Sequence, residues 1–166
     1  MAFSPSILQN LHALTSEGIA LLQQLKQKLD AEQDALVARD IDAIRNCACE
    51  KATLLQSFDK NNTARANTMT QAGVSVDRKG IDALTAQIPD PAARDAFTQM
   101  WSTLEAELKD VMDANQRNEL ILMRNRKSLD QLMGLMRGHG QKQGNTLYNA
   151  KGSKGNYSSQ SHIGKA

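Results

Sequence analysis

The sequence has few aromatic residues and lacks any long apolar run. Phenylalanine, tryptophan and tyrosine make up only 4% of the 166 residues. Leucine, alanine, glutamine and charged residues are abundant, which favours helices over strands. No apolar stretch approaches the roughly 20 residues that are needed to cross a bilayer, and the first residues lack the basic start and apolar segment of a signal peptide. We therefore expect an all-α, cytoplasmic protein without stable membrane insertion.

Residues for catalysis or metal binding are also scarce. His12, His139 and His162 lie far apart, and none stands three or four residues from an acidic residue on an inward helical face, as a di-metal helical bundle requires. Cys47 and Cys49 are two residues apart in a helical segment, so they point in different directions and are poorly placed to share a metal. No Gly-Lys-Ser/Thr turn is present to bind phosphate. We predict no enzyme activity, no metal and no cofactor.

Only three prolines interrupt the chain, and two of them mark helix starts. Ser4 can cap a helix whose first residue is Pro5, and Asp90 can do the same for Pro91, because the first helical position needs no amide hydrogen. Asp40 can cap another long helix between them. The predicted helices span about residues 5–38, 40–70, 77–87 and 91–137.

The first two long helices should form an antiparallel hairpin, because only Arg39 and Asp40 separate them. Apolar residues of the second helix are predicted to face the first helix. This apolar pattern weakens over residues 61–67. The predicted inward positions are Ile41, Ile44, Ala48, Leu55, Phe58 and Met69.

The apolar residues of the last helix recur at three-and-four spacing from Ala93 to Met136. At about 1.5 Å per residue this helix is roughly 70 Å long, whereas each hairpin arm reaches only about 45 to 50 Å. About 20 Å of the last helix, from about Leu120 onward, would then lack an intramolecular partner. Contiguous exposed apolar patches are rarely carried without a use, so this end of the helix is the predicted binding surface.

Other interpretations of the last helix stay open. Its apolar residues, several of them methionines, could fill an intramolecular core or form the seam of a homodimer. Bending of the helix would also remove the unpartnered end. Asn115, Asn118 and Asn125 interrupt the apolar stripe, and their amides could fix the register of internal packing, contact a partner's backbone or face solvent.

Residues 137–166 differ in character from the rest of the chain. They hold five Lys and Arg residues without an acidic residue, and six of the ten glycines. We predict a helical domain over residues 1–137 and a flexible, disordered basic tail over residues 138–166. One function for such a chain is a homodimeric coiled-coil adaptor whose basic tail binds nucleic acid or a membrane. Because the charge of the tail is dilute, we expect no nucleic-acid partner.

Four short segments carry a resemblance to a known family. They are LVARDIDAI at residues 36–44, EKATLL at 50–55, NQRNELI at 115–121 and TLYNAKG at 146–152. With the predicted hairpin and long last helix, they resemble the FlgN family of bacterial flagellar export chaperones over roughly residues 5 to 152. The fold that we expect is an all-α antiparallel hairpin or bundle with a long C-terminal helix and a tail.

The resemblance implies a cytoplasmic, ATP-independent chaperone. Such a protein binds the C-terminal helical segments of the hook–filament junction proteins FlgK and FlgL, prevents their premature association and delivers them to the export-gate protein FlhA. Tyr148 corresponds to the gate-docking tyrosine, although Asn149 replaces an often acidic residue and the chain extends beyond Gly152. The implied client-binding residues are Met112, Asn115, Asn118, Ile121, Leu122, Asn125, Leu129, Leu132 and Met136.

Overall fold

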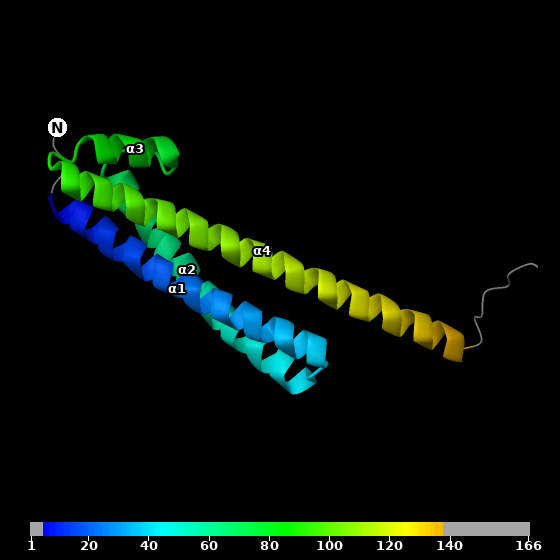
Figure 1. Ribbon diagram of the computed structural model, residues 1–166. Coiled ribbons are helices and arrows are strands. Elements are labelled where there is room, and N and C mark those ends of the chain that lie inside the picture. Colours follow the sequence, from blue (N-terminus) through cyan, green and yellow to red (C-terminus); the bar gives the residue numbers. More distant parts are fainter. Residues whose placement is uncertain (1–4, 138–166) are drawn as a thin grey trace, which may run out of the picture. The chain divides into compact units, whose positions relative to one another are not determined.

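The computed structural model describes residues 5–137, and this part of the chain forms four helices and no strand (Figure 1). The predicted all-α fold is therefore confirmed. Each helix begins and ends within one residue of its predicted range. The tail predicted for residues 138–166 lies outside the described residues. The helices are α1 (Pro5–Ala38), α2 (Ile41–Gln71), α3 (Arg78–Ala86) and α4 (Pro91–Met136).

The chain divides into two compact units, residues 1–125 and residues 126–166. The first unit holds α1, α2, α3 and the part of α4 up to Asn125. The described part of the second unit is the remainder of α4 and Arg137. The first unit thus ends before the boundary that the sequence predicted at residue 137. None of the helices described over residues 5–137 is long and apolar enough to cross a membrane.

A tight joint makes α1 and α2 antiparallel neighbours (Figure 1). Arg39 adopts a left-handed backbone conformation with φ 57°, which reverses the chain after α1. Asp40 then caps α2, because its carboxylate accepts a hydrogen bond of 3.0 Å from the backbone N–H of Ala43. The backbone N–H of Asp40 also donates to the carbonyl of Ala35 at 3.0 Å. The cap that the sequence predicted at Asp40 is therefore present.

The buried apolar residues of the first unit form two clusters, and α1 contributes to both of them. At one end, Leu11 of α1 packs with Met69 of α2, with α3 and with Phe97 of α4. Farther along, Leu22, Leu25 and Leu29 of α1 pack against α4. There α4 contributes Leu104, Val111 and Ala114. The helix α1 is thus the common support of the other elements.

The inward face of α2 agrees with the prediction at Met69, which is buried, and at Phe58, which packs against the second cluster, but differs from it elsewhere. Ile41 and Leu55 are exposed by 70% and 52% of their surface. The buried residues of α2 are Asn61, Arg65, Thr68 and Met69, and the first two of them lie where the apolar pattern weakens. A polar side chain tolerates burial when it is hydrogen-bonded, and the Asn61 side-chain N–H donates to the carbonyl of Leu14 at 2.9 Å. Periodicity of apolar residues could not reveal a face held by polar groups.

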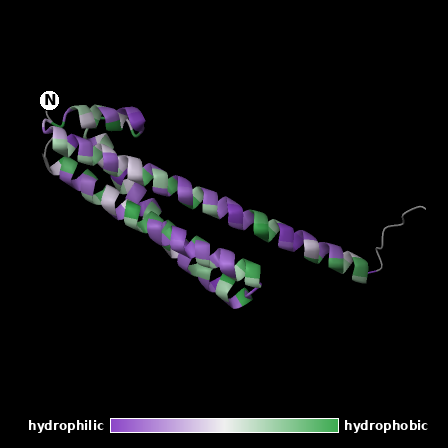
Figure 2. Cartoon of the chain, in the orientation of Figure 1, coloured by the Kyte–Doolittle hydropathy of each residue, from purple (hydrophilic) through white to green (hydrophobic). Residues whose placement is uncertain are grey.

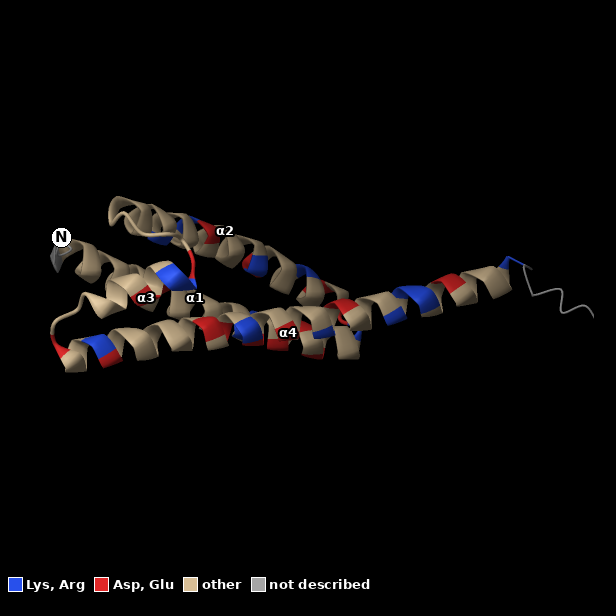
Figure 3. Cartoon of the chain, turned by 90° about the horizontal axis from the view of Figure 1, so that it is seen from above, with Lys and Arg blue, Asp and Glu red and all other residues tan. Residues whose placement is uncertain are grey.

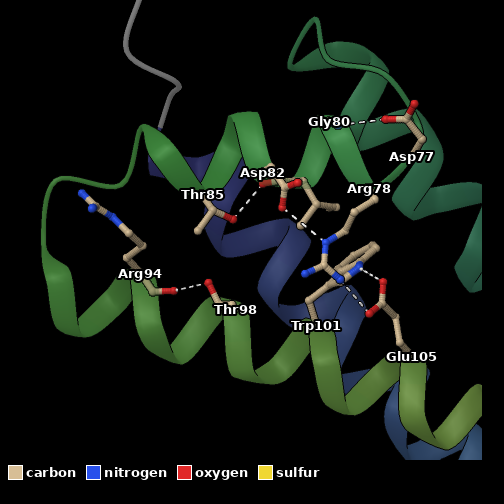
Figure 4. Close-up of polar contacts among 10 residues, drawn as sticks. Asp77, Arg78, Gly80, Asp82, Thr85, Arg94, Thr98, Trp101 and Glu105 are labelled. Atoms are coloured by element: carbon tan, nitrogen blue, oxygen red, sulfur yellow. Dashed lines mark hydrogen bonds and ion pairs between the residues drawn. The ribbon is translucent and has the colours of Figure 1, made fainter.

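Besides its apolar packing, the short helix α3 is joined to α4 by the side chain of Arg78 (Figure 4). The Arg78 guanidinium donates to Asp82 within α3 at 3.3 Å and to Glu105 of α4 at 2.8 Å. Asp77 caps the start of α3 by accepting from the backbone N–H of Gly80 at 2.9 Å. A Cβ atom at Gly80 would lie 1.8 Å from the Ser75 carbonyl oxygen, so only glycine fits there.

Candidate functional site

One face of α4 is apolar along its length, but its surroundings change near Asn118. At about 100° per residue, the buried residues of α4 share one side of the helix. Those buried residues are Phe97, Leu104, Val111, Ala114 and Asn118. The same side continues into a stripe that we call the terminal α4 face. It consists of Leu122, Asn125, Leu129, Leu132, Met133 and Met136.

The terminal α4 face is largely open to solvent. Leu122 is exposed, and in the second unit Leu129 and Met136 expose 60% and 88% of their surface. Leu132 and Met133 are also exposed, whereas Asn125 is half-buried. Figure 2 shows strongly hydrophobic residues, in green, along this end of α4. Exposed apolar side chains at helical spacing are the arrangement that binds a second amphipathic helix.

Asn118 marks the last buried position of this side of α4. It is 1% exposed, and its side-chain N–H groups donate to the Leu29 carbonyl at 2.7 Å and to the Glu32 carboxylate at 2.9 Å. Glu32 is itself buried and accepts from the Lys51 ammonium group of α2 at 2.8 Å through each carboxylate oxygen. One amide therefore ties α4 to α1 and, through Glu32, to α2.

The burial of Asn118 changes its predicted role. The sequence placed it among the client-binding residues, but the structure places it inside the first unit, where its hydrogen bonds are made with α1. Its amide thus fixes the register of α4 on α1, which is one of the interpretations that the sequence left open. We do not include Asn118 in the candidate site.

Three other predicted residues of the first unit lie beside the terminal α4 face or at its edge. Met112 is exposed by 63% on the flank of the helix. Asn115 is half-buried and donates to Glu119 of the same helix at 2.8 Å. Ile121 is half-buried and lines a shallow hollow together with Gln116, Leu120 and Arg124. These residues border the site without belonging to the central stripe.

Positively charged side chains accompany the terminal α4 face, which the sequence reasoning missed. Between residues 124 and 137 the chain carries Arg124, Arg126, Lys127 and, directly after α4, Arg137, and the one acidic residue of this segment is Asp130. Figure 3 shows this predominance of blue over red toward the end of α4. A partner with acidic side chains beside its apolar stripe would be favoured electrostatically. The excess of Lys and Arg in this segment of the sequence could have predicted the positive surface.

The remaining predictions concern metal binding, the two cysteines and the docking residue Tyr148. Among residues 5–137, no group of three or more His, Cys, Asp and Glu side chains is arranged to hold a metal ion. Cys47 is half-buried and Cys49 is exposed, and both are free thiols. Tyr148, the predicted gate-docking residue, lies outside the described residues.

The comparisons with known proteins agree with one another. The family described as FlgN protein matches residues 1–156. A solved structure of a flagella synthesis protein, FlgN, from Pseudomonas aeruginosa is similar to this chain with a TM-score of 0.61 and 30% sequence identity. The similarity covers 81% of this chain and 98% of that chain. Among curated proteins, no sequence matches.

Proposed function

This chain belongs to the FlgN family of flagellar export chaperones, and we propose that it holds an amphipathic helix of an export client on the terminal α4 face. The observation that carries the proposal is the continuity of one side of α4. Its buried residues end at Asn118, and its leucine and methionine side chains from Leu122 to Met136 are exposed. The family is a chaperone family and not an enzyme family.

The chemistry of the terminal α4 face suits a helical client. Residues spaced by three and four along a helix form a stripe, and a second helix covers such a stripe with its own apolar stripe. Covering exposed leucine and methionine side chains contributes about 25 cal/mol per Å² of apolar surface removed from water. Methionine adapts to different partner surfaces, and the adjacent Lys and Arg residues favour a client helix with acidic flanks.

The proposed clients are the hook-associated proteins FlgK and FlgL, which form the hook–filament junction outside the cell. Their C-terminal helical segments would be bound in the cytoplasm, so that their apolar stripes cannot associate before export. The protein would then deliver each client to the export-gate protein FlhA. Tyr148, in the tail beyond α4, is the residue that we propose for this docking step.

A matched pair of substitutions tests the proposed client site. Leu129 and Leu135 are both exposed, but Leu135 points away from the terminal α4 face at about 100° per residue. We expect Leu129→Glu to weaken binding of the FlgK C-terminal segment by about tenfold or more, because burying a leucine contributes about 1.5 to 3 kcal/mol. Leu135→Glu should change the affinity much less. Isothermal titration calorimetry measures both affinities, and circular dichroism verifies helicity.

Equal weakening by the two substitutions, or none by Leu129→Glu, would contradict the proposed site. A second copy of this chain is the competing occupant, because the same apolar stripe can pair with itself in a coiled coil. Sedimentation of the free protein distinguishes the two occupants. The proposal predicts that adding the client segment yields a complex that contains the client. A dimer that the client does not disturb would favour self-association.

A further inference from the structure

A hollow of about 310 Å³ lies between α2 and α4 in the first unit, directly beyond the start of α3. Seen from above in Figure 3, α3 lies between α2 and α4. Leu84 of α3 packs there with Met69 of α2 and Phe97 of α4. The lining of the hollow includes Phe58, Asp77, Arg78, Trp101 and Leu108. The helix α3 thus covers one end of the space between α2 and α4, and the hollow extends from there.

Apolar side chains continue along α2 and α4 beyond the hollow. On α2, Leu55 lies three residues before Phe58 on the same side of the helix, and it is exposed. On α4, Met112 follows Leu108 by four residues and is exposed as well. The sequence predicted Leu55 as an inward residue, and it lies on the side of α2 that borders the hollow. We call the surface formed by Leu55, Phe58, Trp101, Leu108 and Met112 the α2–α4 groove.

A line of α4 residues spaced by seven joins the α2–α4 groove to the terminal α4 face. Seven residues complete about two turns of a helix, so such residues lie on one side of it. Leu108 and Leu122 in this line are exposed, and Trp101 is half-buried. The line consists of Trp101, Leu108, Asn115, Leu122, Leu129 and Met136. Its first half borders the groove, and its second half belongs to the terminal α4 face.

This line is self-complementary when two copies of α4 run antiparallel. Placing its first half against the second half of another copy aligns all six positions. The facing pairs are Trp101 with Met136, Leu108 with Leu129 and Asn115 with Leu122. The same pairs recur with the two copies exchanged, which is the reciprocity of an interface with two-fold symmetry. Since α4 is one continuous helix, it cannot lay its later turns on its own earlier turns. The occupant that this spacing fits is therefore a second copy of the chain.

The charges of the two units favour the same occupant. Residues 1–125 hold 13 Lys and Arg residues against 17 Asp and Glu residues, whereas residues 126–166 hold seven against one. The two units therefore carry net charges of opposite sign. At the groove, the carboxylates of Asp77 and Glu105 line the hollow, and the Arg78 guanidinium is already engaged by Glu105. Opposite charges favour contact between the first unit of one copy and the terminal part of α4 of another.

We propose that the free protein forms a reciprocal dimer, in which residues 122–136 of each copy lie in the α2–α4 groove of the other. The dimer covers the terminal α4 face of both copies, so an export client binds by displacing the second copy. This consequence rests on the proposed client site, whereas self-association does not. We expect a dissociation constant on the order of 10 μM, so that the terminal α4 face is free in dilute protein and available to clients.

Two leucines of similar exposure test the α2–α4 groove. Leu55 and Leu120 expose 52% and 49% of their surface, but Leu120 lies on the side of α4 opposite the line of sevens at about 100° per residue. Leu55→Lys should raise the dissociation constant of the dimer by about tenfold or more, because each dimer loses the burial of two leucines. Leu120→Lys makes the same change in charge and should alter it much less. Sedimentation equilibrium of the full-length protein over a concentration series measures both constants, and circular dichroism verifies the fold.

Cysteine cross-linking tests the register of the two copies. A disulfide forms between side chains whose Cβ atoms lie about 4 Å apart, and residues 108 and 129 are too far apart on one helix to meet within a chain. In a background of Cys47→Ala and Cys49→Ala, a mixture of Leu108→Cys and Leu129→Cys chains should form a disulfide-linked dimer under mild oxidation. Leu108→Cys mixed with Leu135→Cys should not, because Leu135 points away from the line of sevens. Non-reducing gel electrophoresis measures the cross-linked fraction.

Addition of a client separates this inference from the proposed function. An excess of the C-terminal segment of FlgK should convert the wild-type dimer into a complex that contains the client. A dimer with the predicted cross-link that the client leaves intact would support the dimer and contradict the proposed client site. A wild-type chain that stays monomeric throughout the concentration series, equal effects of the two lysine substitutions, or equal cross-linking through Leu129→Cys and Leu135→Cys would overturn the reciprocal dimer.

Discussion

The two halves of one side of α4 differ in environment more than in composition. Up to Asn118 this side carries residues such as Leu104 and Val111, and α1 covers them. From Leu122 onward it carries leucine and methionine at the same spacing, and they are exposed. Apolar character alone therefore does not say whether a helical face belongs to the core or to a binding site. The difference depends on whether another helix of the chain covers the face.

Asn118 lies at the boundary between the covered and the exposed part of this side of α4. Its hydrogen bonds to the Leu29 carbonyl and the Glu32 carboxylate are among the last that join α4 to α1 in the first unit. Arg117 contributes an ion pair of 2.9 Å with Asp30 next to it. A polar contact has stricter geometry than an apolar one, so this cluster fixes which residues of α4 are covered and which remain available.

The largest expected difference between the halves concerns stability. Leu104→Ala removes a buried side chain that is 5% exposed, and it should lower the free energy of unfolding by about 2 to 5 kcal/mol. Leu129→Ala, at an exposed position, should change it by less than about 0.5 kcal/mol. Urea denaturation followed by circular dichroism measures both values. A comparable loss for Leu129→Ala would mean that the terminal α4 face is packed in the free protein.

Asparagine substitutions sharpen the same comparison with a smaller effect. Asn118→Ala removes the second donor to the Leu29 carbonyl and one donor to the buried Glu32 carboxylate, which should cost about 1 to 3 kcal/mol of unfolding free energy. Asn125→Ala, in the next turns of the same side, should cost less than about 0.5 kcal/mol. Equal effects in thermal or urea unfolding would show that Asn118 does not fix the register.

A glycine tests whether the terminal part of α4 can be strengthened without altering the core. No atom lies within 4 Å of the position that a Cβ would occupy at Gly134. Gly134→Ala should therefore favour helix there by about 0.5 to 1 kcal/mol. Amide hydrogen exchange of residues 130–136 should slow, while exchange in α1 should be unchanged. Faster exchange of these residues would contradict this expectation.

The smallest expected effect is a dependence on pH near Asn118. Hydrogen bonding by Lys26, with a further contribution from Arg117, lowers the pKa of Asp30 below its ordinary value of 3.8. A lowered folded-state pKa stabilises the protein above the unfolded-state pKa, and this contribution is lost as the pH falls through the folded-state pKa.

Since the Asp30 side chain is 47% exposed, solvent screening keeps the effect near 0.2 to about 1 kcal/mol. Asp30→Asn should lower the free energy of unfolding by about this amount at pH 7. At pH 2 to about 3, wild-type and variant should be nearly equal. A difference that persists at the acid pH would show that the charge of Asp30 is not its cause.

Local signals were enough to predict the helices. Asp40 and Asp90, which the sequence predicted as caps, each accept a hydrogen bond from a backbone N–H two or three residues later, so the cap and the helix start can be predicted from adjacent residues. The apolar stripe of α4 follows likewise from periodicity. These features depend on interactions over a few residues, which a sequence displays directly.

Long-range polar contacts could not be predicted. The buried Asn61 donates a hydrogen bond to a carbonyl 47 residues away in the sequence. The buried Asn118 donates to residues that are 86 and 89 positions away. In the sequence, Asn118 and Asn125 are equivalent interruptions of one stripe. Only the contacts of α4 with α1 separate them, so the sequence placed both in the client site.

Hydrogen exchange with and without a client tests the central claim most directly. The experiment compares the free protein with its complex with the C-terminal helical segment of FlgK. We predict marked slowing of amide exchange over residues 122–136, because a bound helix covers the terminal α4 face and suppresses its opening. Exchange around Leu22 and Leu25 of α1 should change little. Protection confined to the hairpin, with residues 122–136 unaffected, would contradict the account.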